Sequence, residues 1–240
     1  MRFTNAVIVS VFIGELTGCG VPADENARVD ASNSGGRPKT MDEARKTHIP
    51  EVGKVSSALN ASTCTGAQLQ AATQGQDILL GAMIDAANAY AANPNSEEAI
   101  NLFGQRTDEQ MVDVYYNFLW AIEVLQGDGH DFNIEYNCVS TYMCPANNLA
   151  WSQIPYFTAI CDPDDPLYWS YFPYWQAHEM FHWLGWGDPQ DYGPCDGDCL
   201  EDVLVIAKYA PELAIQMPEA YKQFVIPYIN ARFPGPLYPQ

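Results

Sequence analysis

Apolar residues recur at helical spacing in two long stretches of the chain. Leu69 to Tyr90 and Met111 to Leu125 each place their apolar side chains on one face of a helix with 3.6 residues per turn. Capping signals flank both stretches: Thr65 with Gln68, Asn93-Pro94, Thr107 with Gln110, and Gly127. The pattern therefore predicts two long helices, each with one buried face.

Beyond residue 130 the pattern of apolar positions changes from helical to alternating. Phe132, Ile134 and Tyr136 alternate with polar residues, and Ile154–Cys161 is a second strand candidate. Further helices are expected at about Tyr168–Leu184, Leu200–Tyr209 and Pro218–Ile229. These elements predict an α+β fold that is mostly α-helical and contains a small β-sheet.

The first 19 residues have the pattern of an export signal. Arg2 is followed by the apolar stretch Ala6–Gly14, which is too short to span a bilayer. Leu16-Thr17-Gly18-Cys19 resembles the lipobox of bacterial lipoproteins, in which the cysteine is lipidated after cleavage, and plain secretion is the alternative. We therefore expect an extracellular or cell-surface protein, with lipid at Cys19 as its one membrane contact.

Composition divides the rest of the chain into a polar segment and one folded domain. Residues 20–60 are rich in Asn, Ser, Gly and charged groups, which predicts a disordered tether or a pro-segment. Residues 61–240 are long enough for a single domain, which we expect to be monomeric. The net charge of −19, from 11 basic and 30 acidic residues, argues against nucleic-acid binding because it would repel phosphates.

Seven cysteines are present, and one of them is Cys19 in the signal segment. Six remain if Cys19 is lipidated or removed: Cys64, Cys138, Cys144, Cys161, Cys195 and Cys199. Six cysteines in an exported chain predict three disulfides. The sequence contains no Cys-x-x-Cys pair, the spacing that would indicate a cysteine metal site.

The segment His178–His182 has the pattern His-Glu-x-x-His within a predicted helix. Residues four apart lie on one helix face, so both imidazoles can bind one zinc ion. The carboxylate of Glu179 lies beside them, where it can accept a proton from a zinc-activated water that attacks a peptide carbonyl. The spacing therefore predicts a zinc peptidase with Glu179 as its general base.

A catalytic zinc ion usually has three protein ligands and one open position. No third histidine follows His182, but Asp188 and Asp191 do, and a carboxylate oxygen is a suitable ligand. On this reasoning either aspartate completes the site, with one Zn²⁺ per chain.

Taken together, these features resemble the aspzincin metallopeptidases, in particular the deuterolysin and peptidyl-Lys metalloendopeptidase group. The resemblance covers about Cys64 to Phe224: the active-site helix, the order of Cys64, Cys138, Cys144 and Cys161, and closing helices at Ala207–Ile215 and Glu219–Phe224. It implies a zincin-like domain over 61–240 that hydrolyses protein or peptide substrates. It also implies the disulfides Cys64–Cys138 and Cys144–Cys161, with Cys195–Cys199 as a local extra bridge.

The resemblance also implies particular site residues, with some departures from the family pattern. The family's Gly-Thr-x-Asp-x-x-Tyr-Gly motif corresponds here to Gly187–Gly193, which matches it imperfectly. Asp191 has the family's spacing from His182 and is the expected third ligand, whereas Asp188 would fit the spacing of snapalysin-like peptidases. Tyr192 is the candidate for stabilising the oxyanion.

Two acidic groups near the family's closing helix select a substrate lysine. The matching positions are Glu219, expected to bind substrate, and Lys222, whose opposite charge would repel a substrate lysine. A lysine preference therefore does not follow from the resemblance.

A second functional class is a non-catalytic cell-surface or binding protein built on a zincin scaffold. Such a protein has no need of a general base, so the presence of Glu179 favours an enzyme. Zinc content, together with casein cleavage in the presence and absence of a chelator, distinguishes the two classes.

Overall fold

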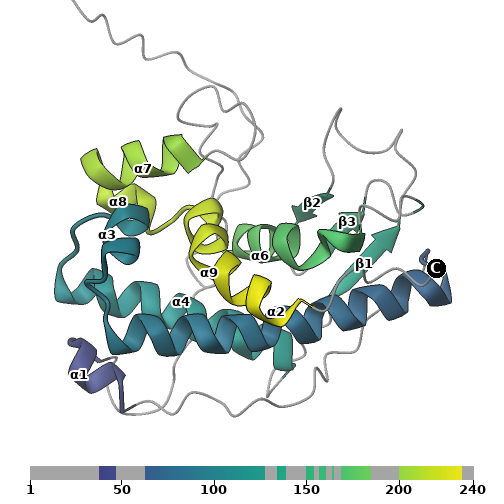
Figure 1. Ribbon diagram of the computed structural model, residues 1–240, viewed down its shortest axis with the longest axis horizontal. Helices are drawn as coiled ribbons and strands as arrows, with labels where there is room; N and C mark the ends of the chain where they lie inside the picture. Colours follow the sequence, from purple (N-terminus) through teal and green to yellow (C-terminus); the bar gives the residue numbers. More distant parts are fainter. Residues whose placement is uncertain are drawn as a thin grey trace, which may run out of the picture.

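The computed structural model describes residues 38–46, 63–127, 134–138, 150–153, 157–160, 164, 169–184 and 200–233. Within these ranges the chain is mostly helical and contains one small β-sheet, as the sequence predicts (Figure 1). None of the helices in the described ranges combines the length and the apolar character that a bilayer crossing requires.

Helices α2 (Gly66–Ala92) and α4 (Asp108–Gln126) pack side by side and form one layer of the fold (Figure 1). Both capping boxes expected from the sequence are present: in each, the threonine and the glutamine three residues later accept a hydrogen bond from each other's backbone N–H. Gly127 ends α4 with φ 67°, a left-handed conformation that glycine adopts without strain. The two long helices are therefore confirmed, together with the signals that start them.

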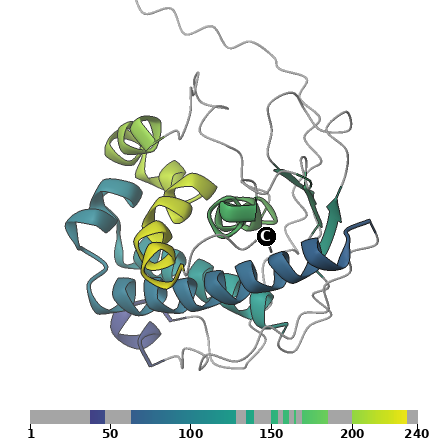
Figure 2. The same ribbon diagram turned by 45° about the vertical axis from the view of Figure 1, so that its right-hand side comes forward.

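Helices α6 (Phe172–His182) and α9 (Pro218–Arg232) form a second layer above α2 (Figure 2). The ring of Phe181 on α6 stacks on Tyr221 of α9, with centroids 4.3 Å apart, and also contacts Phe118 of α4. The hydroxyl of Tyr221 accepts a hydrogen bond from Asn117 and donates one to the carbonyl of Ile215. These buried contacts fix α6 against α9, and the candidate site depends on that arrangement.

The sheet has three strands in the order β1-β3-β2, where β1 is Glu135–Cys138, β2 is Ala150–Gln153 and β3 is Phe157–Ile160. Strand β3 runs parallel to β1 and antiparallel to β2, and β2 packs beside α6. The alternating pattern located β1 and β3 approximately. It missed β2, whose four residues carry no alternation of their own and which is defined by its pairing with β3.

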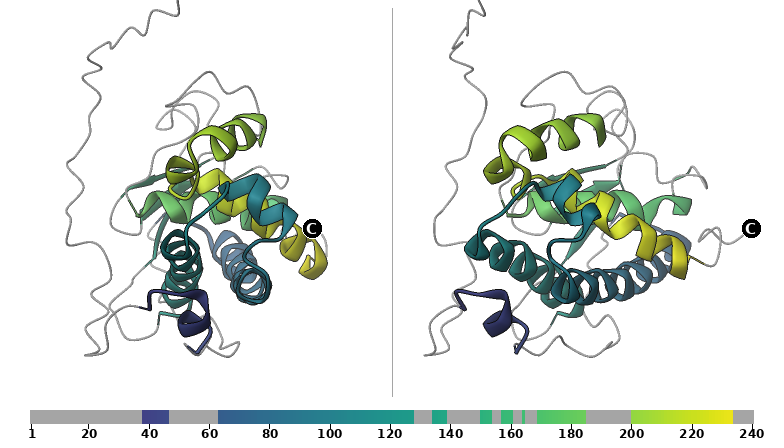
Figure 3. Two further views of the ribbon diagram at one scale, coloured as in Figure 1. Left: turned by 90° about the vertical axis from the view of Figure 1, so that its left-hand side faces the viewer. Right: turned by 60° about the vertical axis from the view of Figure 1, so that its left-hand side comes forward.

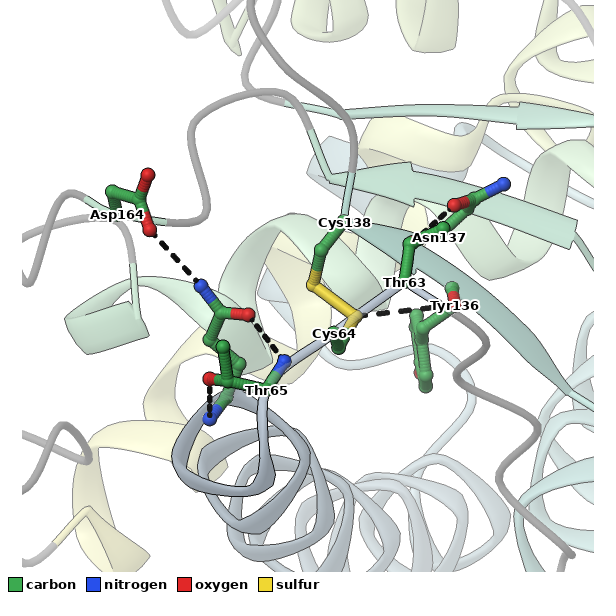
Figure 4. The surroundings of a disulfide bond; sticks show 8 residues. Thr63, Cys64, Thr65, Tyr136, Asn137, Cys138 and Asp164 are labelled. Atoms are coloured by element: carbon green, nitrogen blue, oxygen red, sulfur yellow. Dashed lines mark hydrogen bonds between the residues drawn. A yellow bond between two sulfur atoms is a disulfide. The ribbon is translucent and has the colours of Figure 1, made fainter.

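One disulfide joins the start of α2 to the end of β1, and Figure 4 shows its surroundings. Cys64 and Cys138 are 74 residues apart in sequence, and this is the pair that the family resemblance implied. Closing a loop of this length restricts the unfolded chain and stabilises the fold by about 4 kcal/mol in the chain-entropy model. Beside it, the hydroxyl of Thr63 donates to Asn137 Oδ1 and reinforces the same junction. The bridge thereby anchors the sheet to the helical layer.

Three short helices gather at the end of the molecule opposite the sheet: α3 (Glu97–Phe103), α7 (Leu200–Tyr209) and α8 (Pro211–Ala214) (Figure 1). Gly104 ends α3 with φ 73°, and an added Cβ would lie 2.2 Å from the carbonyl oxygen of Ala207. Glycine at this position therefore allows α3 to approach α7 closely. The apolar pattern predicted α7 but neither α3 nor α8.

A short helix, α1 (Met41–Ala44), lies within the segment whose composition predicts disorder. Met41 and Ala44 are buried, and Arg45 donates from Nε to the carbonyl of Ala91 at the end of α2, at 2.6 Å. Residues 38–46 therefore depart from the expected disorder. Figure 3 shows α1 beneath α4, on the side of the molecule away from α6.

Candidate metal centre

The pair of histidines on α6 brings two ring nitrogens close together. His178 and His182 are four residues apart on one helix, and their Nε2 atoms lie 3.0 Å from each other. The ring planes are inclined by 72°, with centroids 4.8 Å apart, so the rings are not stacked. Both side chains are half-buried at the surface of α6. The two nitrogens can therefore face one common ligand.

This spacing fits a zinc ion. Two nitrogen ligands of a tetrahedral zinc ion, each bonded at 2.0–2.1 Å, are separated by about 3.3 Å. The observed 3.0 Å between the Nε2 atoms is close to that separation. Imidazole is also among the ligands that zinc prefers. The donor type and the distance are thus both compatible with two of the three ligands of a catalytic zinc site.

Glu179 follows His178 directly on α6 and is buried, with 8% of its surface exposed. The buried side chains of Phe172 and Met180 on the same helix hold α6 against the core. The Glu179 side chain is therefore largely shielded from bulk water, and in sequence it lies between the two histidines of α6.

Glu219 of α9 lies on the other side of His178. Its Oε2 is 2.9 Å from His178 Nδ1, whereas the other ring nitrogen of His178, Nε2, faces His182 Nε2. Lys222 Nζ lies 2.9 Å from Oε1 and 3.1 Å from Oε2, and Gln223 Nε2 donates to Oε1 at 2.6 Å. The residue is only 2% exposed. Both oxygens of this buried carboxylate therefore have donors.

Two opposing effects act on the pKa of Glu219. Burial by itself raises it, because removing the carboxylate from water disfavours the charged form. The hydrogen bond with His178, the charges of Lys222 and His178, and the hydrogen bond from Gln223 act in the opposite direction. Their combined effect is larger, and the pKa of Glu219 is lowered below its ordinary value. Glu219 is therefore an ionised acceptor at neutral pH.

Several residues to which the sequence assigns a role in the metal site, in a disulfide or in lipidation lie outside the described residues. They are Asp188, Asp191 and Tyr192, together with Cys144, Cys161, Cys195 and Cys199 and the signal cysteine Cys19. Among the residues that the structure does describe, no group of three or more His, Cys, Asp or Glu side chains could hold a metal. The third ligand, the oxyanion role of Tyr192 and the other two disulfides remain predictions.

The contact between Glu219 and His178 was not foreseen from the sequence, which suggested a substrate contact for Glu219. The two residues are 41 positions apart and meet only because α9 packs on α6. The supporting groups did have a local signal. Lys222 and Gln223 follow Glu219 by three and four residues on one helix, which is the spacing of side chains that can contact each other.

The chain matches no protein-family model and no curated protein. Its function must therefore be argued from the geometry of its own residues. Two features of the site bear on function. The Nε2 atoms of His178 and His182 lie 3.0 Å from each other, and the buried carboxylate of Glu219 contacts Nδ1 of His178.

Proposed function

We propose that this chain is an exported zinc-dependent endopeptidase with a zincin-like fold, as its resemblance to the aspzincins suggests. The observation that supports this most strongly is the convergence of the Nε2 atoms of His178 and His182, 3.0 Å apart, with Glu179 between them in sequence. The mostly helical fold with a small sheet beside α6 is compatible with the proposal.

In this proposal His178 and His182 hold one zinc ion through their Nε2 atoms. Asp191 supplies the third ligand, with Asp188 as the alternative. A bound zinc ion supplies Lewis acidity, which polarises a peptide carbonyl and lowers the pKa of a water molecule toward neutrality.

The other steps belong to the side chains of the chain. Glu179 accepts a proton from the attacking water and delivers it to the nitrogen of the leaving amine. Its burial favours this role, since few bulk waters compete for the carboxylate. Tyr192 is proposed to donate a hydrogen bond to the oxyanion that develops on the substrate carbonyl.

The test is zinc content and casein cleavage of the purified chain, with and without a chelator. The proposal predicts one zinc ion per chain and cleavage that stops in chelator and returns with added zinc. A His182→Ala variant should lose the metal, whereas His130→Ala, which changes a histidine without an assigned role, should retain it. Zinc without cleavage would favour a non-catalytic binding protein on the same scaffold, and a wild-type chain that binds no zinc would contradict the metal site itself.

A further inference from the structure

Residues 38–46, which include α1, contact the domain through three side chains on one face. Met41, Ala44 and Arg45 have the i, i+3 and i+4 spacing that places side chains together on a helix. Met41 and Ala44 are 6% and 0% exposed and belong to the hydrophobic core. Arg45 donates from Nε to the carbonyl oxygen of Ala91 in α2, and α1 packs on α4. The segment therefore contacts both long helices of the first layer.

The contact with Ala91 stabilises the end of α2. The last carbonyl groups of a helix have no donor within the helix, and a positive charge near them is favourable. Helix α2 has no basic residue in its own last turn, so it does not supply such a charge itself. Arg45 lies 46 residues earlier in the chain and brings both a donor and a charge to Ala91. The N-terminal segment thereby caps the longest helix that the structure describes.

Helix α1 depends on this packing for its own stability. A helix of four residues is too short to be stable in water by itself. The side chain of Thr40 accepts from the backbone N–H of Glu43, and the Glu43 carboxylate accepts from the backbone N–H of Lys39. These local hydrogen bonds favour the helical conformation, and the burial of Met41 and Ala44 against the domain stabilises it.

The position of α1 determines its relation to the candidate metal centre. Figure 3 shows α1 beneath α4, on the side of the molecule away from α6, which holds His178 and His182. Residues 38–46 therefore lie away from the histidine pair, and their removal would not uncover it. An inhibitory pro-segment has to cover the site that it blocks, so residues 38–46 do not fit that role.

We infer that residues 38–46 are a clasp: a permanent part of the domain that attaches the N-terminal segment to α2 and α4 and is retained in the mature protein. Composition left residues 20–60 open to either a tether or a pro-segment. The docked clasp excludes residues 38–46 from any pro-segment that is removed. Any proteolytic processing at the N-terminus therefore takes place before Pro38, and opening of the clasp destabilises the domain without activating it.

Hydrogen exchange of the full chain measures the docking of the clasp directly. In the docked state the backbone N–H groups of Ala44, Arg45 and Lys46 donate to carbonyls within the segment. They should exchange at least about 10-fold more slowly than in a synthetic peptide of residues 36–50, because exchange in the chain requires the clasp to open. Mass spectrometry of the fragment that contains residues 38–46 gives both rates. Equal rates in the chain and the peptide would overturn the inference.

Two pairs of variants of the full chain identify the contacts that hold the clasp. Met41→Asp places a charge in the buried interface and should abolish the protection, whereas Lys46→Asp places the same carboxylate at an exposed position and should retain it. Arg45→Ala removes the donor to Ala91 and should speed exchange by about 3–10-fold, whereas Lys46→Ala removes an exposed basic side chain and should not. Protection that survives Met41→Asp would overturn the inference. Should Met41→Asp fail to fold, wild-type exchange rates in Arg45→Ala would equally overturn it.

Two further measurements test retention of the clasp and its lack of an inhibitory role. The intact mass of the mature protein should include residues 38–46, and a mature protein that begins after Lys46 would overturn the inference. Zinc-loaded Met41→Asp should cleave casein no faster than the zinc-loaded wild type, and a gain of activity would show that the segment is inhibitory. Only this comparison rests on the proposed function. A protected clasp in a chain that binds no zinc and cleaves no casein would support the inference and refute the peptidase proposal.

Discussion

Gly75 on α2 lies close against α6, the helix that holds the candidate site. A Cβ added to Gly75 would lie 2.3 Å from Cδ1 of Phe172, the first residue of α6. The Phe172 ring is fully buried between Trp169, Tyr136 and Trp175, with ring centroids at 5.6, 5.5 and 4.5 Å. Because the ring is buried among these neighbours, we expect Gly75→Ala to displace α6 or strain the core.

The expected magnitude follows from two opposing effects. Alanine favours a helix interior over glycine by about 1 kcal/mol, whereas overpacking a closely packed core costs about 1–3 kcal/mol. Because the contact is with a buried ring, the second effect should dominate. The net expectation is that Gly75→Ala lowers the free energy of unfolding by up to about 2 kcal/mol. Displacement of α6 should also weaken zinc binding, since His178 and His182 lie on the same helix.

Gly81→Ala is the matched control on the same helix. An added Cβ there would lie 2.5 Å from Nη1 of Arg232, the end of a flexible side chain that can move into solvent. Moving it disturbs the partly exposed pair between Arg232 and Asp85, which contributes about 0–1 kcal/mol. The gain in helix propensity should offset this loss. Urea unfolding followed by circular dichroism measures both variants, and a Gly75→Ala chain as stable as Gly81→Ala would refute the packing argument.

Two further predictions concern the third metal ligand and alkaline pH. Asp191→Ala should weaken zinc binding strongly, and Asp188→Ala only mildly, in competition with a chelating dye; the reverse order would assign the third ligand to Asp188. Burial raises the pKa of Tyr136, and this effect is larger than the lowering effect of its hydrogen bond from Gln76. The folded chain therefore holds this phenol neutral. Its stabilising contribution is complete below the unfolded pKa of about 10 and is lost as pH rises above it, by about 1.4 kcal/mol per pH unit. A urea midpoint that stays constant from pH 9 to 11 would contradict this.

Local signals in the sequence predicted the long elements of the fold. The capping boxes at Thr65 and Thr107 and the left-handed Gly127 act within a few residues of each helix end, so they can be recognised without knowledge of the fold. Strand β2 and the short helix α3 could not be predicted in this way. Each is too short to show a period, and each is stabilised by contacts with distant segments, β2 with β3 and α3 with α7.

The same division applies to the candidate site. The His178 and His182 pair follows from the spacing of four residues on a helix, and the structure brings their Nε2 atoms together. The position of Glu219 against Nδ1 depends on the packing of Phe181 on Tyr221, which fixes α9 relative to α6. Side-chain packing between elements far apart in the chain is not encoded in any local pattern. The sequence therefore indicated the two histidines but not the carboxylate that contacts one of them.

We propose that this chain hydrolyses peptide bonds with Glu179 as the general base beside a zinc ion. The most direct test is the casein hydrolysis rate of Glu179→Gln relative to the wild type, with zinc content determined on the same samples. We predict that both proteins hold one zinc ion per chain and that the variant is slower by a factor of about 10²–10⁴, because the attacking water loses its proton acceptor. A Glu179→Gln chain that retains zinc and cleaves casein at nearly the wild-type rate would show that Glu179 is not the general base.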